Sequence, residues 1–193
     1  VIGLEYNKWS KRATVTHDVI IPYLRMWVGP MDYTPGAMLN AHPETFYENQ
    51  HEPMSQGTRC RQLATYVIFD SPLNMLCDNP SNYRKEPECT AFIARIPTVW
   101  DETLGLDGKV GEYITMARRS GDEWYVGGLT NWDKRDITVD LSFLGEGFYE
   151  IELFKDGINA DRAACDYKRV VMPVPEDRQL KVTLFLGGGF AGR

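Results

Sequence analysis

Hydrophobic positions follow one pattern up to about residue 108 and a different one beyond it. In the first part, short apolar runs alternate with longer stretches whose apolar residues recur every three or four positions, which predicts strands alternating with helices. The expected helices are 19–28, 61–76 and 88–96, and the expected strands are 1–5, 31–34 and 98–100. Strands that alternate with helices form parallel sheets, so this part is expected to be α/β.

Two prolines and a polar stretch refine this expectation. Pro22 is tolerable only in the first turn of its helix, and Pro72 is expected to kink or split the helix 61–76, because proline lacks the backbone N–H that a helix interior needs. The polar, proline-punctuated stretch 39–55 is long for a simple connection, so we expect a functional loop there.

From about residue 109, apolar and polar residues alternate in short runs, most clearly in 137–141 and 149–153. Turn-forming residues separate the runs. Six strands are expected, at 112–118, 123–129, 136–141, 148–154, 167–174 and 179–186. This spacing is typical of an antiparallel β-sandwich or a small barrel. We therefore divide the chain into domains 1–108 and 109–193, and we expect the glycines at 187–189 to form a flexible terminal segment.

Composition narrows the function classes. The chain is 43% hydrophobic, which is enough to build a core, and its net charge of −6 with scattered basic residues argues against a nucleic-acid partner. No apolar run approaches the length of a membrane-spanning helix, so no membrane partner is expected. The cysteines form no Cys-x-x-Cys pair, which excludes a zinc ribbon or a thioredoxin-like motif; Cys60 and Cys77 are expected to be buried thiols, and a bridge from Cys77 to Cys89 stays open.

Acidic residues follow three of the expected strands: Glu5, Asp32, and the pair Asp101 and Glu102. In parallel α/β folds, catalytic groups gather at the carboxyl ends of strands. Each of these acids adjoins an aromatic residue, and carboxylates beside exposed aromatic rings suit a carbohydrate substrate. The alternative is that strand-end acids cap the following helices, which is the commoner role. Both interpretations stay open at this point.

Other candidates are weaker. Trp124 and Trp132 could form a platform on which a sugar stacks, although core packing is the commoner role for such residues. His17 and Asp18 are expected to be a helix-capping pair rather than part of a metal site. The sequence has no Gly-x-Ser-x-Gly elbow to support a serine nucleophile.

Longer motifs distributed along the whole chain carry a family resemblance. In the first half they are Gly29-Pro-Met-Asp-Tyr-Thr-Pro-Gly36, Ser71-Pro-Leu-Asn-Met75 with Asn82-Tyr83, and Ile96-Pro-Thr-Val-Trp-Asp-Glu-Thr103. In the second half they are Trp124-Tyr-Val-Gly-Gly128, Asn131-Trp132 and Phe154-Lys-Asp-Gly-Ile-Asn-Ala-Asp-Arg162. Together they resemble glycoside hydrolase family 97 from the first residue to the last.

The resemblance implies that the chain is the C-terminal portion of a longer enzyme. Residues 1–5, 31–34 and 98–100 would then be strands six, seven and eight of a (β/α)8 barrel, and residue 109 onward would be the C-terminal β-sandwich. The N-terminal β-supersandwich and the first five barrel strands would belong to the missing N-terminal part of the same enzyme, which would be the chain's partner.

The resemblance also implies a chemistry. Family members hydrolyse α-glycosidic bonds, as α-glucosidases that invert or α-galactosidases that retain, and they use calcium. Glu5 matches the family's general acid, which lies at or near the calcium site, whereas Asp32, Asp101 and Glu102 would at most line the cleft for an oligosaccharide. A periplasmic or secreted location is implied as well. Specificity and stereochemistry stay open because the second carboxylate and the remaining calcium ligands would lie upstream.

A non-enzymatic alternative remains. The 193 residues alone are expected to be inactive, because three barrel strands cannot close a barrel. The chain would then be a catalytically inert remnant whose β-sandwich acts as a structural or carbohydrate-binding module.

Overall fold

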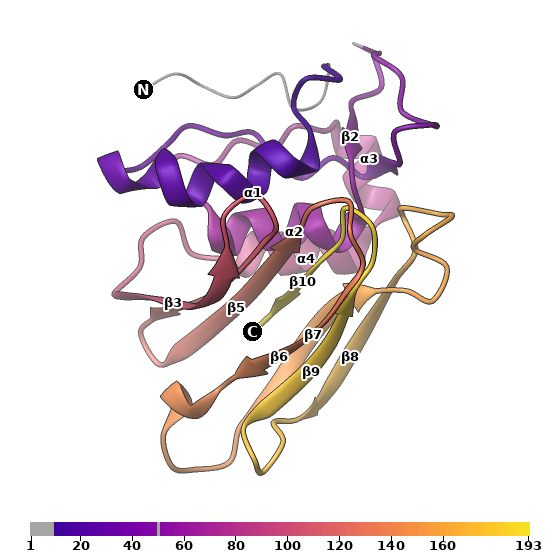
Figure 1. Cartoon of the computed structure of the whole chain (residues 1–193). Helices are drawn as coiled ribbons and strands as arrows, with labels where there is room; N and C mark the ends of the chain where they lie inside the picture. Colours follow the sequence, from indigo (N-terminus) through magenta and orange to yellow (C-terminus); the bar gives the residue numbers. More distant parts are fainter. Residues whose placement is uncertain (1–9, 50) are drawn as a thin grey trace.

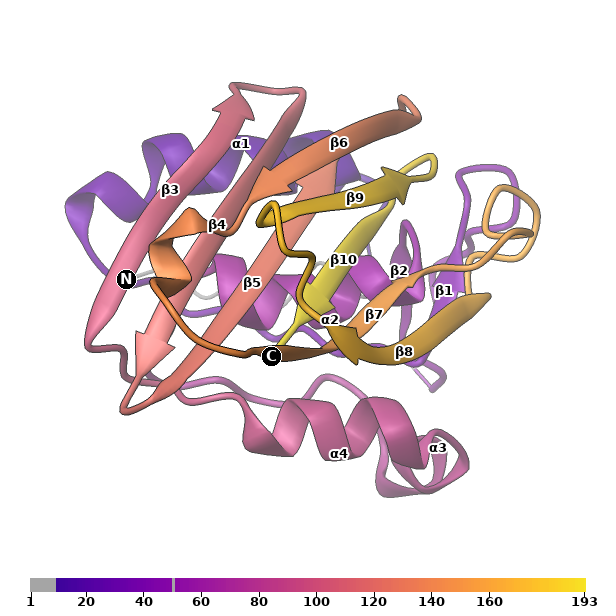
Figure 2. The same ribbon diagram turned by 90° about the horizontal axis from the view of Figure 1, so that it is seen from below.

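A computed structural model describes residues 10–49 and 51–193. Three layers lie on top of one another: helices, a six-stranded antiparallel sheet, and a two-stranded antiparallel sheet (Figures 1 and 2). The helices cover one face of the large sheet, and the small sheet covers part of the other face. None of the helices in the described ranges is long and apolar enough to cross a membrane.

The large sheet has the order β3-β4-β5-β10-β7-β8, and β6 pairs with β9 in the small sheet. The strands are β3 (Glu102–Lys109), β4 (Tyr113–Ser120), β5 (Glu123–Thr130), β6 (Arg135–Asp140), β7 (Glu150–Asp156), β8 (Tyr167–Pro173), β9 (Gln179–Leu184) and β10 (Gly189–Gly192). All six strands expected from the alternating pattern are confirmed. Apolar residues from the facing sides of the two sheets form one core, which confirms a sandwich-like arrangement.

Two strands of the large sheet, β3 and β10, were not expected from the sequence. Residues 107 and 108 lie inside β3, so the sheet begins before residue 109; the division at 108 itself stays a prediction. The prediction of a flexible terminal segment at 187–189 is wrong, because β10 begins at Gly189 and lies in the middle of the large sheet. A Cβ on Gly189 would lie 2.7 Å from the Gly128 carbonyl and 2.8 Å from the Cα of Arg61. Glycine is required at 189 because a helix and a neighbouring strand approach the backbone closely.

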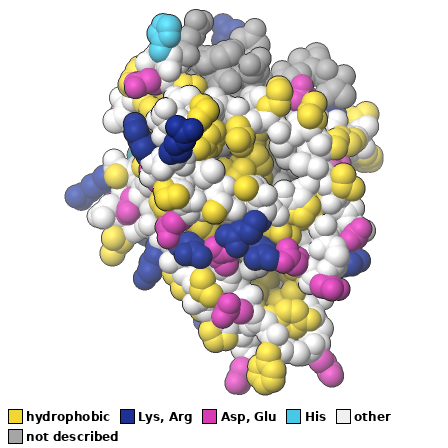
Figure 3. Space-filling view, turned by 180° about the vertical axis from the view of Figure 1, so that it is seen from behind, with side chains coloured by type: hydrophobic (Ala, Val, Ile, Leu, Met, Phe, Trp, Pro, Cys, Tyr) yellow, Lys and Arg dark blue, Asp and Glu magenta, His cyan; other side chains and the backbone are white. Residues whose placement is uncertain are grey.

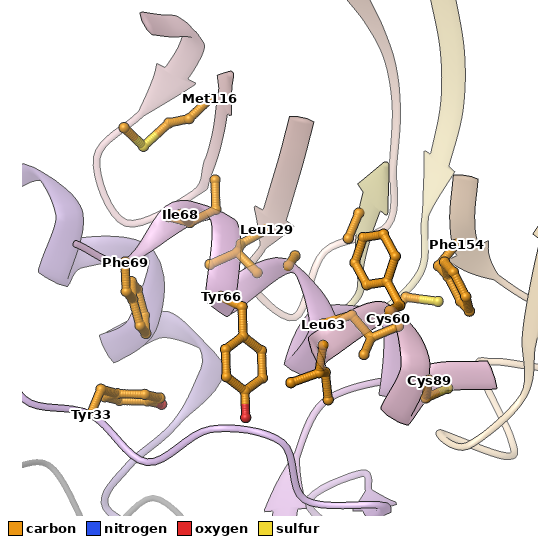
Figure 4. Close-up of a cluster of buried hydrophobic side chains, with 14 of the residues drawn as sticks. Tyr33, Cys60, Leu63, Tyr66, Ile68, Phe69, Cys89, Met116, Leu129 and Phe154 are labelled. Carbon is orange, nitrogen blue, oxygen red and sulfur yellow. The ribbon is translucent and has the colours of Figure 1, made fainter. Parts of the chain in front are cut away.

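That helix is α2 (Arg59–Ile68), and every residue in it is buried. The side chain of Thr58 caps its N-terminus by accepting a hydrogen bond from the backbone N–H of Arg61, 3.2 Å away. Its apolar side chains contact both the sheet and the other helices, as the close-up in Figure 4 shows for Leu63, Ile68 and their neighbours. The two halves of the sequence therefore share one core.

The other helical elements are α1 (Val15–Leu24), η2 (Met26–Val28), α3 (Pro80–Lys85), α4 (Pro87–Arg95) and η3 (Ser142–Leu144). Helix α1 begins earlier than expected because Thr14 caps it, which places Pro22 in the last turn and not in the first. Helix α2 ends at Ile68, so Pro72 lies beyond it. The loop expected at 39–55 contains two short parallel strands, β1 (Leu39–Ala41) and β2 (Met54–Gln56).

Residues 98–100 do not form the expected strand. Thr98 and Val99 follow Pro97 as bends, and Trp100 packs against the side of the large sheet, with its ring 5.3 Å from that of Tyr125. The parallel neighbour of the segment at 31–34 is instead residues 70–74: the Met31 N–H donates to the Asp70 carbonyl, and Tyr33 forms an isolated parallel bridge with Asn74.

All four cysteines lie in the described part of the chain and are thiols, so the possible bridge from Cys77 to Cys89 does not form. Cys60 and Cys77 are buried, as expected.

Candidate functional site

Glu5, the residue on which the expected chemistry depends most, lies outside the described residues. The other three predicted site residues are described, and they occupy two different places in the structure. Asp101 and Glu102 lie together at the start of β3, whereas Asp32 lies in the segment that follows η2.

Asp101 and Glu102 are exposed and share one partner, Arg119 of β4. The Arg119 guanidinium lies 3.9 Å from Asp101 and 3.2 Å from Glu102, and the backbone N–H of Gly121 donates to Asp101 at 2.7 Å. These contacts tie the start of β3 to the turn between β4 and β5. They give both acids a structural role, and a role in binding substrate stays a prediction.

Asp32 has a different environment. It is half-buried, and among the described residues its Oδ1 has no hydrogen-bond partner. It lies between Met31 and Tyr33, the residues whose backbone contacts place this segment parallel to residues 70–74. A strand-end carboxylate with an unused acceptor oxygen can still bind a hydroxyl group or another donor.

The loop that follows Asp32 is held rigidly by side chains from the helices. Gln62 of α2 accepts a hydrogen bond from the Gly36 N–H at 2.9 Å, and the Tyr66 hydroxyl donates to the Pro35 carbonyl at 2.9 Å. The Tyr83 hydroxyl of α3 donates to the Gly36 carbonyl at 3.0 Å. Gly36 adopts a φ of +94° and has no room for a Cβ beside Tyr66, so only glycine fits there.

Arg59 fixes the next part of the same loop. This buried side chain donates to the Asn40 side-chain oxygen at 2.7 Å and to the Met38 carbonyl, and it forms an ion pair with Glu86 at 2.9 Å. Asn40 in turn donates to Ser55 of β2 at 3.0 Å. Helix α2 therefore positions the whole loop after Asp32 through a satisfied buried network.

A second arginine of α2 anchors α1. The Arg61 guanidinium lies 2.7 Å from Asp18 and donates to the Val15 carbonyl at 3.0 Å. Burial would raise the pKa of Asp18, but the charge of Arg61 and the contact with His17 hold it below its usual value. Tyr33 donates to the other oxygen of Asp18 at 3.1 Å, so Asp18 is part of this ion-paired anchor. Thr14, not a pair of His17 and Asp18, caps the helix.

Sequence patterns gave no signal for these arginines, because buried and exposed arginine look alike in a polar–apolar pattern.

The two tryptophans considered as a sugar-stacking platform, Trp124 and Trp132, lie in different places in the structure. Trp132 packs over Gly187, with its ring 6.1 Å from that of His42, whereas Trp124 lies on the inner face of the sandwich and lines a cavity. The face in Figure 3 shows acidic and basic side chains intermingled.

Comparison with known families gives one match to a family model. Residues 99–193 match the family described as "Glycosyl-hydrolase 97 C-terminal, oligomerisation". That range begins just before β3 and includes the whole sandwich.

Two curated proteins are similar in sequence. A retaining alpha-galactosidase of Bacteroides thetaiotaomicron is 62% identical over 193 residues, which cover 99% of this chain and 29% of that protein. A probable retaining alpha-galactosidase of Streptomyces bingchenggensis is 30% identical over 154 residues, covering 78% of this chain and 22% of that protein. The chain thus spans less than a third of the length of the curated relatives it matches.

Solved structures agree. A glycoside hydrolase family 97 enzyme from Pseudoalteromonas sp. strain K8, in complex with acarbose, superposes with a TM-score of 0.82 at 30% identity, covering 98% of this chain and 30% of that one. A beta-arabinopyranosidase gives a TM-score of 0.75 at 25% identity over 93% of this chain and 27% of that one. The chain therefore belongs to glycoside hydrolase family 97, and it matches the C-terminal portion of that family's members.

Proposed function

We propose that this chain is part of an enzyme that hydrolyses α-galactosides with retention of configuration. The observation that carries this proposal is the 62% identity, over 99% of the chain, to a retaining alpha-galactosidase. The weaker similarity to a probable retaining alpha-galactosidase points the same way and makes an α-glucoside the less favoured substrate.

In this proposal the first part of the chain contributes the end of a (β/α)8 barrel. The parallel contact between residues 31–33 and 70–74 supports it, because neighbouring barrel strands are parallel. Strand seven keeps its expected place, whereas strand eight moves from 98–100 to 70–74. Asp32 would then lie at the end of strand seven, on the face where barrel enzymes place their active sites.

Glu5 would be the general acid. Its carboxyl proton passes to the glycosidic oxygen as the bond from that oxygen to the anomeric carbon breaks, and a second carboxylate from the missing part of the protein attacks the anomeric carbon. Glu5, then ionised, takes a proton from the water that hydrolyses the resulting glycosyl ester. Such an acid needs a raised pKa to stay protonated near neutral pH.

Calcium is proposed only for the longer protein. Within residues 10–49 and 51–193, no group of three or more histidine, cysteine, aspartate or glutamate side chains could hold a metal ion. By the resemblance, its ligands would be Glu5 and groups upstream of this chain. A periplasmic or secreted location is likewise a proposal from the resemblance.

The test is Glu5→Gln in the longer protein. Turnover of melibiose should fall by about 10²–10⁴-fold, the usual contribution of general acid catalysis. Turnover of an aryl α-galactoside should fall much less, because a phenolate leaves without protonation. Glu146→Gln, the same change at an exposed glutamate in the turn before β7, is the matched control and should retain activity. An equal loss on both substrates would contradict the acid role of Glu5.

A second role is favoured by the description of the matched family model, which includes oligomerisation. We propose that residues 99–193 contribute to self-association of the longer protein, in addition to packing against the barrel part. Light scattering of the longer protein over a range of concentrations would test this role, and a monomer throughout would contradict it.

A further inference from the structure

A cavity of about 440 Å³ opens at one end of the sandwich. The two strands β6 and β9 cover only part of the large sheet, and the short strand β10 pairs with residues 126–129 of β5 and 153–155 of β7. The ends of β5 and β7 beyond this pairing border the cavity, and the η3 turn closes its side. Its volume lies within the range of about 300–1,000 Å³ typical of small-molecule sites.

One wall of the cavity is aromatic and aliphatic. Trp124 of β5 is half-buried, and its ring lies 4.6 Å from that of Phe143 in η3. Tyr149 and Val171 continue this wall, and Val171 is 50% exposed. Wide aromatic faces of this kind bind the apolar C–H faces of a flat, partly hydrophobic ligand.

The other wall is polar, and its arginines are paired. Glu152, which is 9% exposed, lies between Arg95 at 3.1 Å and Arg169 at 2.8 Å. Glu123 and Arg193 form a second ion pair across the mouth. Planar carboxylate and guanidinium groups present several acceptors and donors in fixed directions.

The charges on this wall select a class of ligand. Three arginines and four acids line the cavity, so a phosphate would meet the acids and an ammonium group would meet the arginines. A neutral ligand with many hydroxyl groups meets neither repulsion, because a hydroxyl both donates and accepts hydrogen bonds. Aromatic faces on one wall and paired charges on the other fit such a molecule.

We propose that this cavity binds a neutral sugar and is a second carbohydrate site, separate from the catalytic one. It is built almost entirely from residues of the sandwich, with only Arg95 contributed by α4. The proposal does not depend on Glu5, so it can hold even where the catalytic proposal fails.

The test is titration of the 193-residue chain with melibiose and with maltotriose. Binding is measured by isothermal titration calorimetry and by saturation-transfer NMR. At least one of the two sugars should bind saturably. Trp124→Ala should weaken binding at least about tenfold, as expected for removal of an aromatic anchor. Val171→Arg should weaken it similarly by filling the mouth of the cavity without disturbing the core, because Val171 is half exposed on the surface.

Two control variants locate the site. Val110→Arg adds the same side chain at a residue that is 58% exposed and lies in the turn between β3 and β4, away from the cavity. Asp32→Ala removes the described acid proposed to lie at the end of barrel strand seven. Both variants should bind as the unmodified chain does. The proposal is overturned if neither sugar binds at millimolar concentration, or if binding survives Val171→Arg and is lost in Asp32→Ala.

Discussion

Replacing Asp156 with asparagine is expected to stabilise the protein, and to do so most strongly above neutral pH. Asp156 ends strand β7 and is 6% exposed. Its Oδ2 accepts hydrogen bonds from the backbone N–H groups of Phe185, at 3.0 Å, and of Gly189, at 3.2 Å. Burial raises the pKa of Asp156 to about 7, although these hydrogen bonds and the charge of Arg61 oppose the rise.

The size of the effect follows from the difference between the pKa of Asp156 in the folded protein and its pKa in the unfolded chain. The ordinary pKa of the group is 3.8, so the folded protein binds this proton more tightly than the unfolded chain does. The contribution of Asp156 to stability is therefore greatest below pH 4 and falls as the pH rises through 7, by a total of about 4 kcal/mol. Roughly 2–3 kcal/mol of that loss is expected between pH 5 and pH 8. Asparagine keeps a carbonyl acceptor for the two amides and carries no charge.

Urea unfolding of the 193-residue chain at pH 5, 6, 7 and 8, followed by circular dichroism, measures this difference. The difference in the free energy of unfolding between the variant and the unmodified chain should widen as the pH rises. The contributions of all other titrating groups are common to both proteins and cancel in this difference. Asp161→Asn, at an exposed aspartate, is the matched control and should leave the pH dependence unchanged. Parallel stability curves for Asp156→Asn and the unmodified chain would refute the assigned cost of burying this charge.

Two further variants test the buried ion pair of α2 and the close packing of β5 against Phe190 of β10. Arg61→Met leaves Asp18 buried without its 2.7 Å partner, so the free energy of unfolding should fall by about 3–5 kcal/mol in urea titrations; a loss below about 1 kcal/mol would contradict a buried ion pair. Gly128→Ala places a Cβ 2.3 Å from the Phe190 ring and should cost about 1–3 kcal/mol in the same assay. Gly105→Ala, where nothing lies within 4 Å, should be nearly neutral, and equal effects at the two glycines would refute the close approach.

The sandwich could be predicted from the sequence because its alternation reports burial directly. In β7, Ile151 and Leu153 face the sandwich core, and residues of β9 alternate in the same way. Strand β10 carries no such signal, because Gly189 lies where α2 and β5 leave no room for a side chain and Gly192 lies close to Ile151 and Val126. Strand β3 is mostly exposed, so its pattern lacks the buried positions on which the prediction depends.

The candidate site was predictable only in part, for a different physical reason. Acids at strand ends point to Asp32, whose environment leaves an acceptor oxygen unused among the described residues. The same rule chose Asp101, because residues 98–100 before it read as a short strand. In the structure they form no strand, and Trp100 packs against Tyr125 at the side of the sheet. The buried arginines that hold the loop after Asp32 could not be predicted, since their partners are far away in sequence.

The proposed activity is tested most directly by the anomer first released from an α-galactoside. The longer protein that contains this chain should hydrolyse melibiose, and proton NMR taken during the first turnovers should show α-galactose before mutarotation. Release of the β-anomer would contradict retention. Failure to hydrolyse α-galactosides while cleaving α-glucosides would contradict the proposed substrate.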